Sequence, residues 1–117
     1  MNFRDEHPFE HRCNESKKVR ARYPTRLPVI CERHAQTGAS LPKSDKRKFL
    51  VPRDLSMAQF SMVIRKRLQI EASTALFLTT QNGILPPVTQ QLHIVYDEHR
   101  DDDGFLYLHY SAENTFG

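Results

Sequence analysis

The chain of 117 residues has the length of one compact domain, and its 38% hydrophobic and 26% charged residues are typical of neither a membrane protein nor a disordered one. Two cysteines exclude a disulfide scaffold and a four-thiolate zinc site, so we expect a protein of a reducing compartment. The net charge of +3 conceals two unlike halves, because residues 1–67 sum to +9 and residues 68–117 sum to −6. This asymmetry predicts a polarised surface that attracts a partner.

The first predicted element is a polar helix over about residues 8–23. Pro8 suits the first turn of a helix, and Pro24 ends the segment. Apolar residues are sparse within it, so we expect the helix to cover an edge of the core, anchored by Phe3 and Phe9.

Two strands are predicted next, over residues 27–32 and 48–52, with a loop at residues 34–44 between them. The first strand is apolar and partly β-branched, and the second is closed by Pro52. Alternation along the first strand places its residues on two faces. One face carries Leu27, Val29 and Cys31, and the other carries Pro28, Ile30 and Glu32.

A helix over residues 56–68 carries the strongest local signal. Ser56 and Gln59 have the spacing of a capping box, and Leu55 and Phe60 have the spacing of a hydrophobic staple. Apolar residues then recur at helical spacing, which predicts an amphipathic helix. They are Phe60, Val63, Ile64 and Leu68.

The remaining pattern completes a recognisable order of elements. It predicts a strand at 75–79, a turn at Asn82-Gly83, a short helix at 89–98, a strand at 105–110 and a loose tail at 111–117. Without the first helix, this is the order of the β-grasp fold, an α+β fold in which one helix packs across a mixed sheet.

Catalysis is the least supported class of function. Cys13 lies in a polar helix and Cys31 at a core-facing strand position, and neither has a neighbour that would activate it as a nucleophile. His7 and His11 are spaced to chelate a metal on a helix face, but no third ligand is evident. With four glycines there is no phosphate-binding loop. We therefore expect no enzyme, no metal and no cofactor.

Binding of nucleic acid or of peptides is the alternative. Basic clusters at 17–26, 43–53 and 65–67 have the charge for nucleic acid, but Phe49 lies in an apolar strand that suits a core or a peptide groove better. We therefore expect no nucleic-acid partner. Lys46, Arg47 and Lys48 beside that strand would attract acidic residues of a peptide added to the sheet edge. The same lysines could instead serve only to prevent aggregation at the strand edge, and the sequence of this segment alone supports the two interpretations equally.

Several motifs together resemble a known family. They are EHPFE at 6–10, YPTRLPVI at 23–30, DKRKFLVP at 45–52, IRKR at 64–67, FLY at 105–107 and FG at 116–117. In this order and spacing they are similar to the autophagy ubiquitin-like modifiers, the family of the GABA-receptor-associated protein and microtubule-associated light chain 3. The resemblance implies one ubiquitin-like domain, with two helices in an extension at 1–24, a β-grasp core with a four-stranded mixed sheet at 25–110 and a flexible conjugation tail at 111–117.

The resemblance also implies a mechanism. Members of the family are activated by ubiquitin-type activating and conjugating enzymes and are joined through a C-terminal glycine to phosphatidylethanolamine. Gly117 would supply that carboxylate, either as the end of the gene product or after a protease exposes it. The protein would then be cytoplasmic, and on autophagosomal membranes when conjugated.

Cargo receptors of this family present an aromatic-x-x-aliphatic motif, often preceded by acids. By the resemblance, the aromatic pocket comprises Glu15, Val19, Pro28, Ile30, Lys48, Leu50 and Phe105. The aliphatic pocket comprises Phe49, Val51, Pro52, Leu55, Phe60, Val63 and Ile64, with Arg67 nearby. The alternative is an unconjugated adaptor that uses the same groove and binds tubulin or microtubules through its basic N-terminal helices.

Overall fold

A four-stranded mixed sheet organises the computed structural model, which describes residues 1–37 and 40–113. The strand order is β2-β1-β4-β3, in which β1 (Arg26–Arg33) and β4 (Leu106–Ser111) run parallel at the centre. At the edges, β2 (Lys48–Pro52) and β3 (Phe77–Thr80) pair antiparallel to β1 and β4 respectively. This arrangement confirms the predicted four-stranded mixed sheet of an α+β fold.

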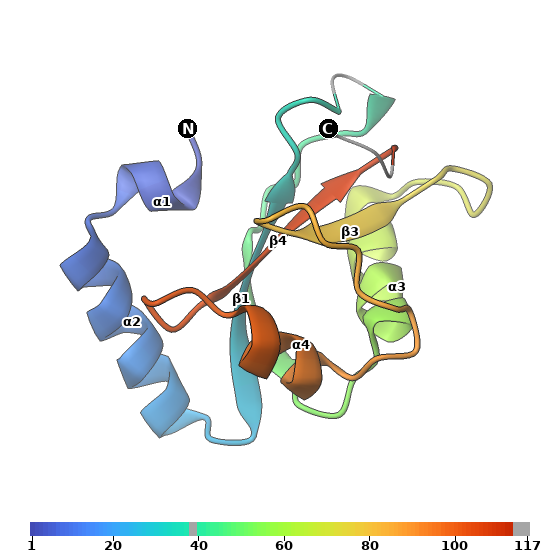
Figure 1. The fold of residues 1–117 in the computed structure, drawn as a ribbon. Helices are drawn as coiled ribbons and strands as arrows, with labels where there is room; N and C mark the ends of the chain where they lie inside the picture. Colours follow the sequence, from blue (N-terminus) through green and yellow to red (C-terminus); the bar gives the residue numbers. More distant parts are fainter. Residues whose placement is uncertain (38–39, 114–117) are drawn as a thin grey trace.

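Helices cover both faces of the sheet (Figure 1). On one side lie α1 (Phe3–Glu6) and α2 (Phe9–Arg22), which are the two N-terminal helices that the resemblance implies. On the other lies α3 (Met57–Leu68), and α4 (Leu92–His99) closes one end before β4. In the part of the chain that the structure describes, no helix has the length and apolar character of a bilayer span.

The two faces of β1 serve two separate clusters of buried residues, which confirms the predicted alternation. Leu27, Val29 and Cys31 belong to the main core. Ile30 points to the opposite face, where it joins a small cluster beneath the N-terminal helices. Because both faces are covered, the strand is buried along most of its length.

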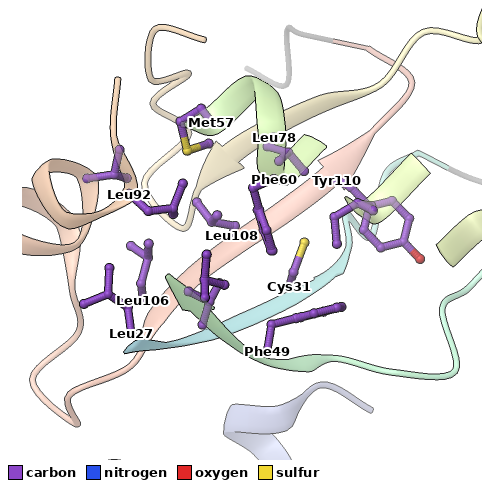
Figure 2. Packing of buried hydrophobic residues seen from close by; sticks show 14 of the residues in the cluster. Leu27, Cys31, Phe49, Met57, Phe60, Leu78, Leu92, Leu106, Leu108 and Tyr110 are labelled. Carbon is purple, nitrogen blue, oxygen red and sulfur yellow. The ribbon is translucent and has the colours of Figure 1, made fainter. Parts of the chain in front are cut away.

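The main core lies between the sheet and α3 (Figure 2). Phe60 and Ile64 on α3 are buried, and the ring of Phe60 meets that of Phe49 edge to face at 5.6 Å between centroids. The predicted capping box is present, since the Ser56 side chain accepts from the Gln59 N–H at 3.1 Å and Gln59 Oε1 accepts from the Ser56 N–H at 2.9 Å. Local chemistry thus determines where this helix begins.

Polar contacts hold α2 against the sheet, and here one expectation is wrong. Phe3 is buried as predicted, but Phe9 is 50% exposed and lies 5.5 Å from the guanidinium of Arg12 instead of entering the core. The buried residues of α2 are Arg12 and Ser16. The helix has no apolar stripe, so burial of Phe9 would have to rotate its polar residues into the sheet.

Several predicted boundaries differ from those in the structure. The loose tail predicted from residue 111 begins too early, because Ser111 is the buried last residue of β4. The strand β3 begins at Phe77 instead of residue 75, and α4 begins at Leu92 instead of residue 89. Before α4 the chain forms a turn whose carbonyls pair with the start of α3, since Gln90 O accepts from the Met57 N–H at 2.9 Å. These bonds belong to tertiary structure, so local propensity does not reveal them.

Candidate functional site

A groove of about 450 Å³ lies between α2 and β2. The groove is lined by six of the seven residues that the resemblance assigns to an aromatic pocket. These six residues come from α2, β1, β2 and the position before β4. The lining residues are Glu15, Val19, Arg26, Pro28, Lys46, Lys48, Phe49, Leu50 and Phe105. Arg26 is an addition that the sequence motifs do not single out.

The seventh residue, Ile30, is fully buried below the groove. It packs in a small cluster with Phe3, Phe105 and Tyr107. The rings of Phe3 and Phe105 meet edge to face at 5.4 Å between centroids. Because Phe3 comes from α1, the N-terminal extension supports the floor of the groove.

The free edge of β2 runs along this groove. Cys31 N–H donates to Arg47 O at 2.8 Å, and the register then pairs Phe49 with Val29. In an antiparallel ladder hydrogen-bonded positions alternate, so the backbone groups of Lys48 and Leu50 point away from β1. The side chains of these two residues are exposed, whereas that of Phe49 enters the core. An incoming strand would find main-chain groups and side chains at the same two positions.

Basic side chains surround the mouth of the groove. The Lys48 ammonium forms an ion pair with Glu15 of α2, and the Lys46 ammonium lies 5.0 Å from the centroid of the Phe49 ring. Arg26 Nη1 donates to Leu50 O at 3.2 Å. The groove therefore combines an apolar floor with a cationic rim.

Arg47 does not line the groove, although its neighbours Lys46 and Lys48 do. It pairs with Glu6 of α1 and lies 3.5 Å from Glu32 of β1. The hydrogen bond from Arg47 lowers the pKa of Glu6, while burial raises the pKa of Glu32. Arg47 thus ties α1 to the sheet.

The residues assigned to an aliphatic pocket divide between core and surface. Four of them, Phe49, Val51, Phe60 and Ile64, are buried in the main core. Leu55 is half-buried against that core, and Pro52, Val63 and Arg67 are exposed. The exposed members are available to a ligand, while the buried ones shape the surface from below.

Comparison with known proteins connects this architecture to a family. A family model described as "Autophagy protein Atg8 ubiquitin like" matches residues 11–117. The chain belongs to the Atg8 family. It is 48% identical over 115 residues to Autophagy-related protein 8 of Pichia angusta, a match that covers 98% of this chain and 90% of that protein. The corresponding proteins of Lodderomyces elongisporus and Emericella nidulans are 50% and 47% identical over 98% of this chain, and the matches cover 77% and 95% of their own lengths.

Membership of the Atg8 family assigns the chain to autophagy and its sheet to the ubiquitin-like fold. Gly117 falls within the matched range but outside the residues that the structure describes. Its assignment as the conjugation site therefore stays a proposal, taken up below.

An ion-pair network joins α2 to the turn before β4, and the sequence motifs do not predict it. Asp103 Oδ2 accepts from Arg12 Nη1 at 2.6 Å and from the Tyr107 hydroxyl at 2.5 Å, and its Oδ1 accepts from the Phe105 N–H at 2.8 Å. Burial, followed by the hydrogen bond to Asp103, raises the pKa of Tyr107. The network holds the Atg8-family extension in place above the sheet.

A second acid of the same turn reinforces the attachment. Asp101 lies 3.4 Å from Arg4 of α1 and 3.9 Å from Arg12, and it accepts from Gln81 at 3.1 Å. Burial alone would raise the pKa of Asp101, but the Asp103 N–H, Gln81 and the two arginines lower it. Asp101 and Asp103 thus join the extension to the core.

The two cysteines and the pair His7 and His11 are the candidates for a nucleophile or for metal ligands. Burial raises the pKa of the Cys31 thiol, and Cys13 is free and half-buried. The rings of His7 and His11 stack at 5.0 Å between centroids. No group of three or more metal-ligating side chains occurs within residues 1–37 and 40–113.

Proposed function

We propose that this Atg8-family protein is a lipid-conjugated modifier whose groove recruits receptors carrying an aromatic-x-x-aliphatic motif preceded by acidic residues. The observation that carries the proposal is the groove between α2 and β2, which places an apolar floor and a cationic rim beside an unpaired strand edge. Those three properties match the aromatic side chain, the acidic residues and the backbone of such a peptide.

The backbone, the aromatic side chain and the acids of the peptide each have a counterpart in the groove, and the aliphatic side chain is assigned to the exposed residues Pro52 and Val63. The backbone adds to β2 through the outward N–H and C=O groups of Lys48 and Leu50, where the peptide replaces Arg26 as the donor to the Leu50 carbonyl. The aromatic side chain occupies the space between Val19, Pro28 and Phe105, and acids before it meet Lys46 and Lys48.

A pair of matched variants tests the groove. Leu50 and Ile84 are both exposed apolar residues, at 37% and 49%, but only Leu50 lines the groove. We expect Leu50→Ala to weaken binding of such a peptide by about tenfold, since it truncates a pocket wall, and Ile84→Ala to leave it unchanged. Calorimetric titration measures both. Equal effects of the two substitutions would overturn the assignment of the groove.

Conjugation uses Gly117. An activating enzyme joins the carboxylate to the nucleotide of a nucleoside triphosphate and releases pyrophosphate, and an enzyme cysteine then displaces the nucleoside monophosphate to form a thioester. The amine of phosphatidylethanolamine attacks the thioester carbonyl, the enzyme thiolate leaves, and an amide forms. Glycine has no Cβ, so it fits a narrow active-site channel and leaves the carbonyl open to attack. Ser111 ends β4 and the Ala112 N–H donates to Thr37 Oγ1 at 2.9 Å, so the tail begins after Ala112. The five residues 113–117 span at most ~18 Å when extended, which is enough to deliver the terminus while the folded part contacts an enzyme elsewhere. The attached lipid brings two acyl chains, as stable membrane anchoring requires.

The test of conjugation is reconstitution with ubiquitin-type activating and conjugating enzymes and vesicles that contain phosphatidylethanolamine. We expect wild type to acquire the mass of the lipid at Gly117 and Gly117→Ala to acquire none. In cells, the wild type should move from cytoplasm to autophagosomal membranes, and the variant should not. Unchanged lipidation of Gly117→Ala would contradict this part of the proposal.

A second candidate is an unconjugated adaptor that binds tubulin through α2. Four basic residues of α2 are exposed and favour an acidic partner. They are Lys17, Lys18, Arg20 and Arg22. Diffuse wild-type protein in starved cells, together with intact peptide binding and microtubule co-sedimentation, would favour this candidate.

A further inference from the structure

Four side chains form a continuous series from His7, which lies between α1 and α2, to the rim of the groove. The rings of His7 and His11 stack with an interplanar angle of 21°. His11 Nε2 lies 3.7 Å from Glu15 Oε2, one helical turn further on. The other oxygen of Glu15 pairs with the Lys48 ammonium.

Glu15 therefore competes with a ligand for the same cation. An acidic residue of a peptide that approaches Lys48 must share it with a carboxylate already in contact with it. While His11 is neutral, the Glu15–Lys48 pair presents no net charge. When His11 is protonated, it adds a positive charge beside the free oxygen of Glu15, and the same three groups carry a charge of +1.

We infer that His11 makes the preference of the groove for acidic peptides depend on pH, by neutralising Glu15 and releasing Lys48 as the pH falls. The inference rests on the proposed peptide-binding function and adds a regulation to it. Histidine is the side chain that ordinarily gains its charge between pH 8 and pH 5. A carboxylate one helical turn away is placed to interact with that charge.

Other charged groups near the series keep their sign over this range of pH. Lys46 and Arg26 line the groove from the side of β2 and β1 and stay cationic. Near His7 are three further charged side chains. The first is Glu6, whose carboxylate interacts electrostatically with His7. The second is Arg47, which pairs with Glu6. The third is Arg12, whose Nε donates to His7 O at 3.0 Å. The groups that change charge are therefore the imidazoles.

The expected effect is modest because the groups are partly exposed. His11 and Lys48 retain more than half of their side-chain exposure, while Glu15 retains 23%. Ion pairs in such positions change affinity by about two- to fivefold. The effect should apply to the acidic flank of a peptide and not to its aromatic or aliphatic anchors.

Two synthetic peptides separate these contributions. One carries Asp-Asp-Asp before a Trp-x-x-Leu core, and the other carries Asn-Asn-Asn before the same core. Aspartate stays ionised from pH 5.5 to 7.5, so any change arises in the protein. Because the chain has no tryptophan, fluorescence of the peptide reports binding directly. The measured quantity is the ratio of the two dissociation constants at each pH.

For wild type, we expect the preference for the acidic peptide to rise about two- to fivefold from pH 7.5 to pH 5.5. His11→Gln should keep the wild-type ratio at pH 7.5 and lose the rise. Glu15→Gln should show the higher preference at both pH values, because Lys48 is then never paired with a carboxylate. His93→Gln, on α4 and away from the groove, is the matched control and should behave as wild type.

The outcomes separate the role of His11 from the proposed peptide binding in the groove, on which it rests. If both peptides bind with a ratio that does not change with pH, the groove stands and the role of His11 is overturned. A rise that persists in His11→Gln also overturns that role. If neither peptide binds at either pH, the proposed groove fails and the inference fails with it.

Discussion

The ion pair between Arg12 and Asp103 leads to the sharpest prediction about stability. The Arg12 side chain is 9% exposed and that of Asp103 is fully buried, so the two charges depend on each other. Replacement of Arg12 by leucine leaves a buried carboxylate without its counter-charge. Replacement of both residues, in Arg12→Leu with Asp103→Asn, removes both charges of this pair and leaves Asp101 with Arg4.

The magnitudes follow from this difference. Removal of one partner of a buried pair typically costs 3–5 kcal/mol, and Tyr107 and the Phe105 N–H still bind Asp103, so we expect a loss of about 3 kcal/mol for Arg12→Leu. Asp103→Asn keeps one of the two acceptor oxygens and replaces the other by an NH2 donor, so it should cost about 2 kcal/mol in the wild-type background. In the Arg12→Leu background the same substitution removes the unpaired charge, and we expect it to recover about 1.5 kcal/mol.

Urea denaturation of the four proteins, followed by circular dichroism, measures these free energies of unfolding. Hydrogen exchange of the α2 amides shows in parallel whether the helix leaves the sheet. The decisive result is the sign, because Asp103→Asn should destabilise wild type and stabilise Arg12→Leu. If the two losses add within about 0.5 kcal/mol, the reasoning about the buried charge is refuted.

Three further predictions concern the groove rim, the turn before β4 and the end of the sheet. Lys48→Glu should weaken binding of an acidic-flanked peptide at low salt, and calorimetry should show the difference in affinity from wild type shrinking as salt rises. A loss of affinity that does not depend on salt would contradict attraction by charge. Gly104→Ala should lower the melting temperature, because φ of Gly104 is +93° and the new Cβ would overlap Ser16 Oγ. Addition of Ser16→Gly should restore part of this loss by removing the overlap. Full restoration would show that the backbone at residue 104 is not strained. Burial, with a smaller contribution from His34, lowers the pKa of His109 in the folded protein. The contribution of His109 to the free energy of unfolding is therefore fully present above the ordinary histidine pKa and is lost as the pH falls from there through the lowered pKa. Urea denaturation should show a smaller drop in stability between pH 7.5 and pH 5.5 for His109→Gln than for wild type, and an equal drop would count against this.

The sequence predicts those parts of the fold that depend on local chemistry. The start of α3 follows from Ser56 and Gln59, which satisfy each other's backbone groups within one turn. The two faces of β1 follow from strict alternation. In both cases the residues that interact are neighbours in the chain.

Features that depend on distant partners are not predicted. Asp103 reads as one acid in a polar run, because its partner Arg12 lies 91 residues earlier. Phe9 is expected to be buried because it is aromatic, but nothing local shows which side of a polar helix faces the sheet. Arg47 lies between two lysines of the groove and faces away from it, which only the position of Glu6 reveals.

The attachments of the two N-terminal helices differ in their share of apolar burial, so the two helices respond differently to temperature. Ion pairs through Arg4 and Glu6 hold α1 together with buried Phe3, and the contribution of Phe3 weakens on cooling. Arg12 and Asp103 hold α2 by a buried ion pair, whose desolvation penalty falls on warming. Cooling therefore weakens the attachment of α1 more than that of α2, and warming favours the attachment of α2.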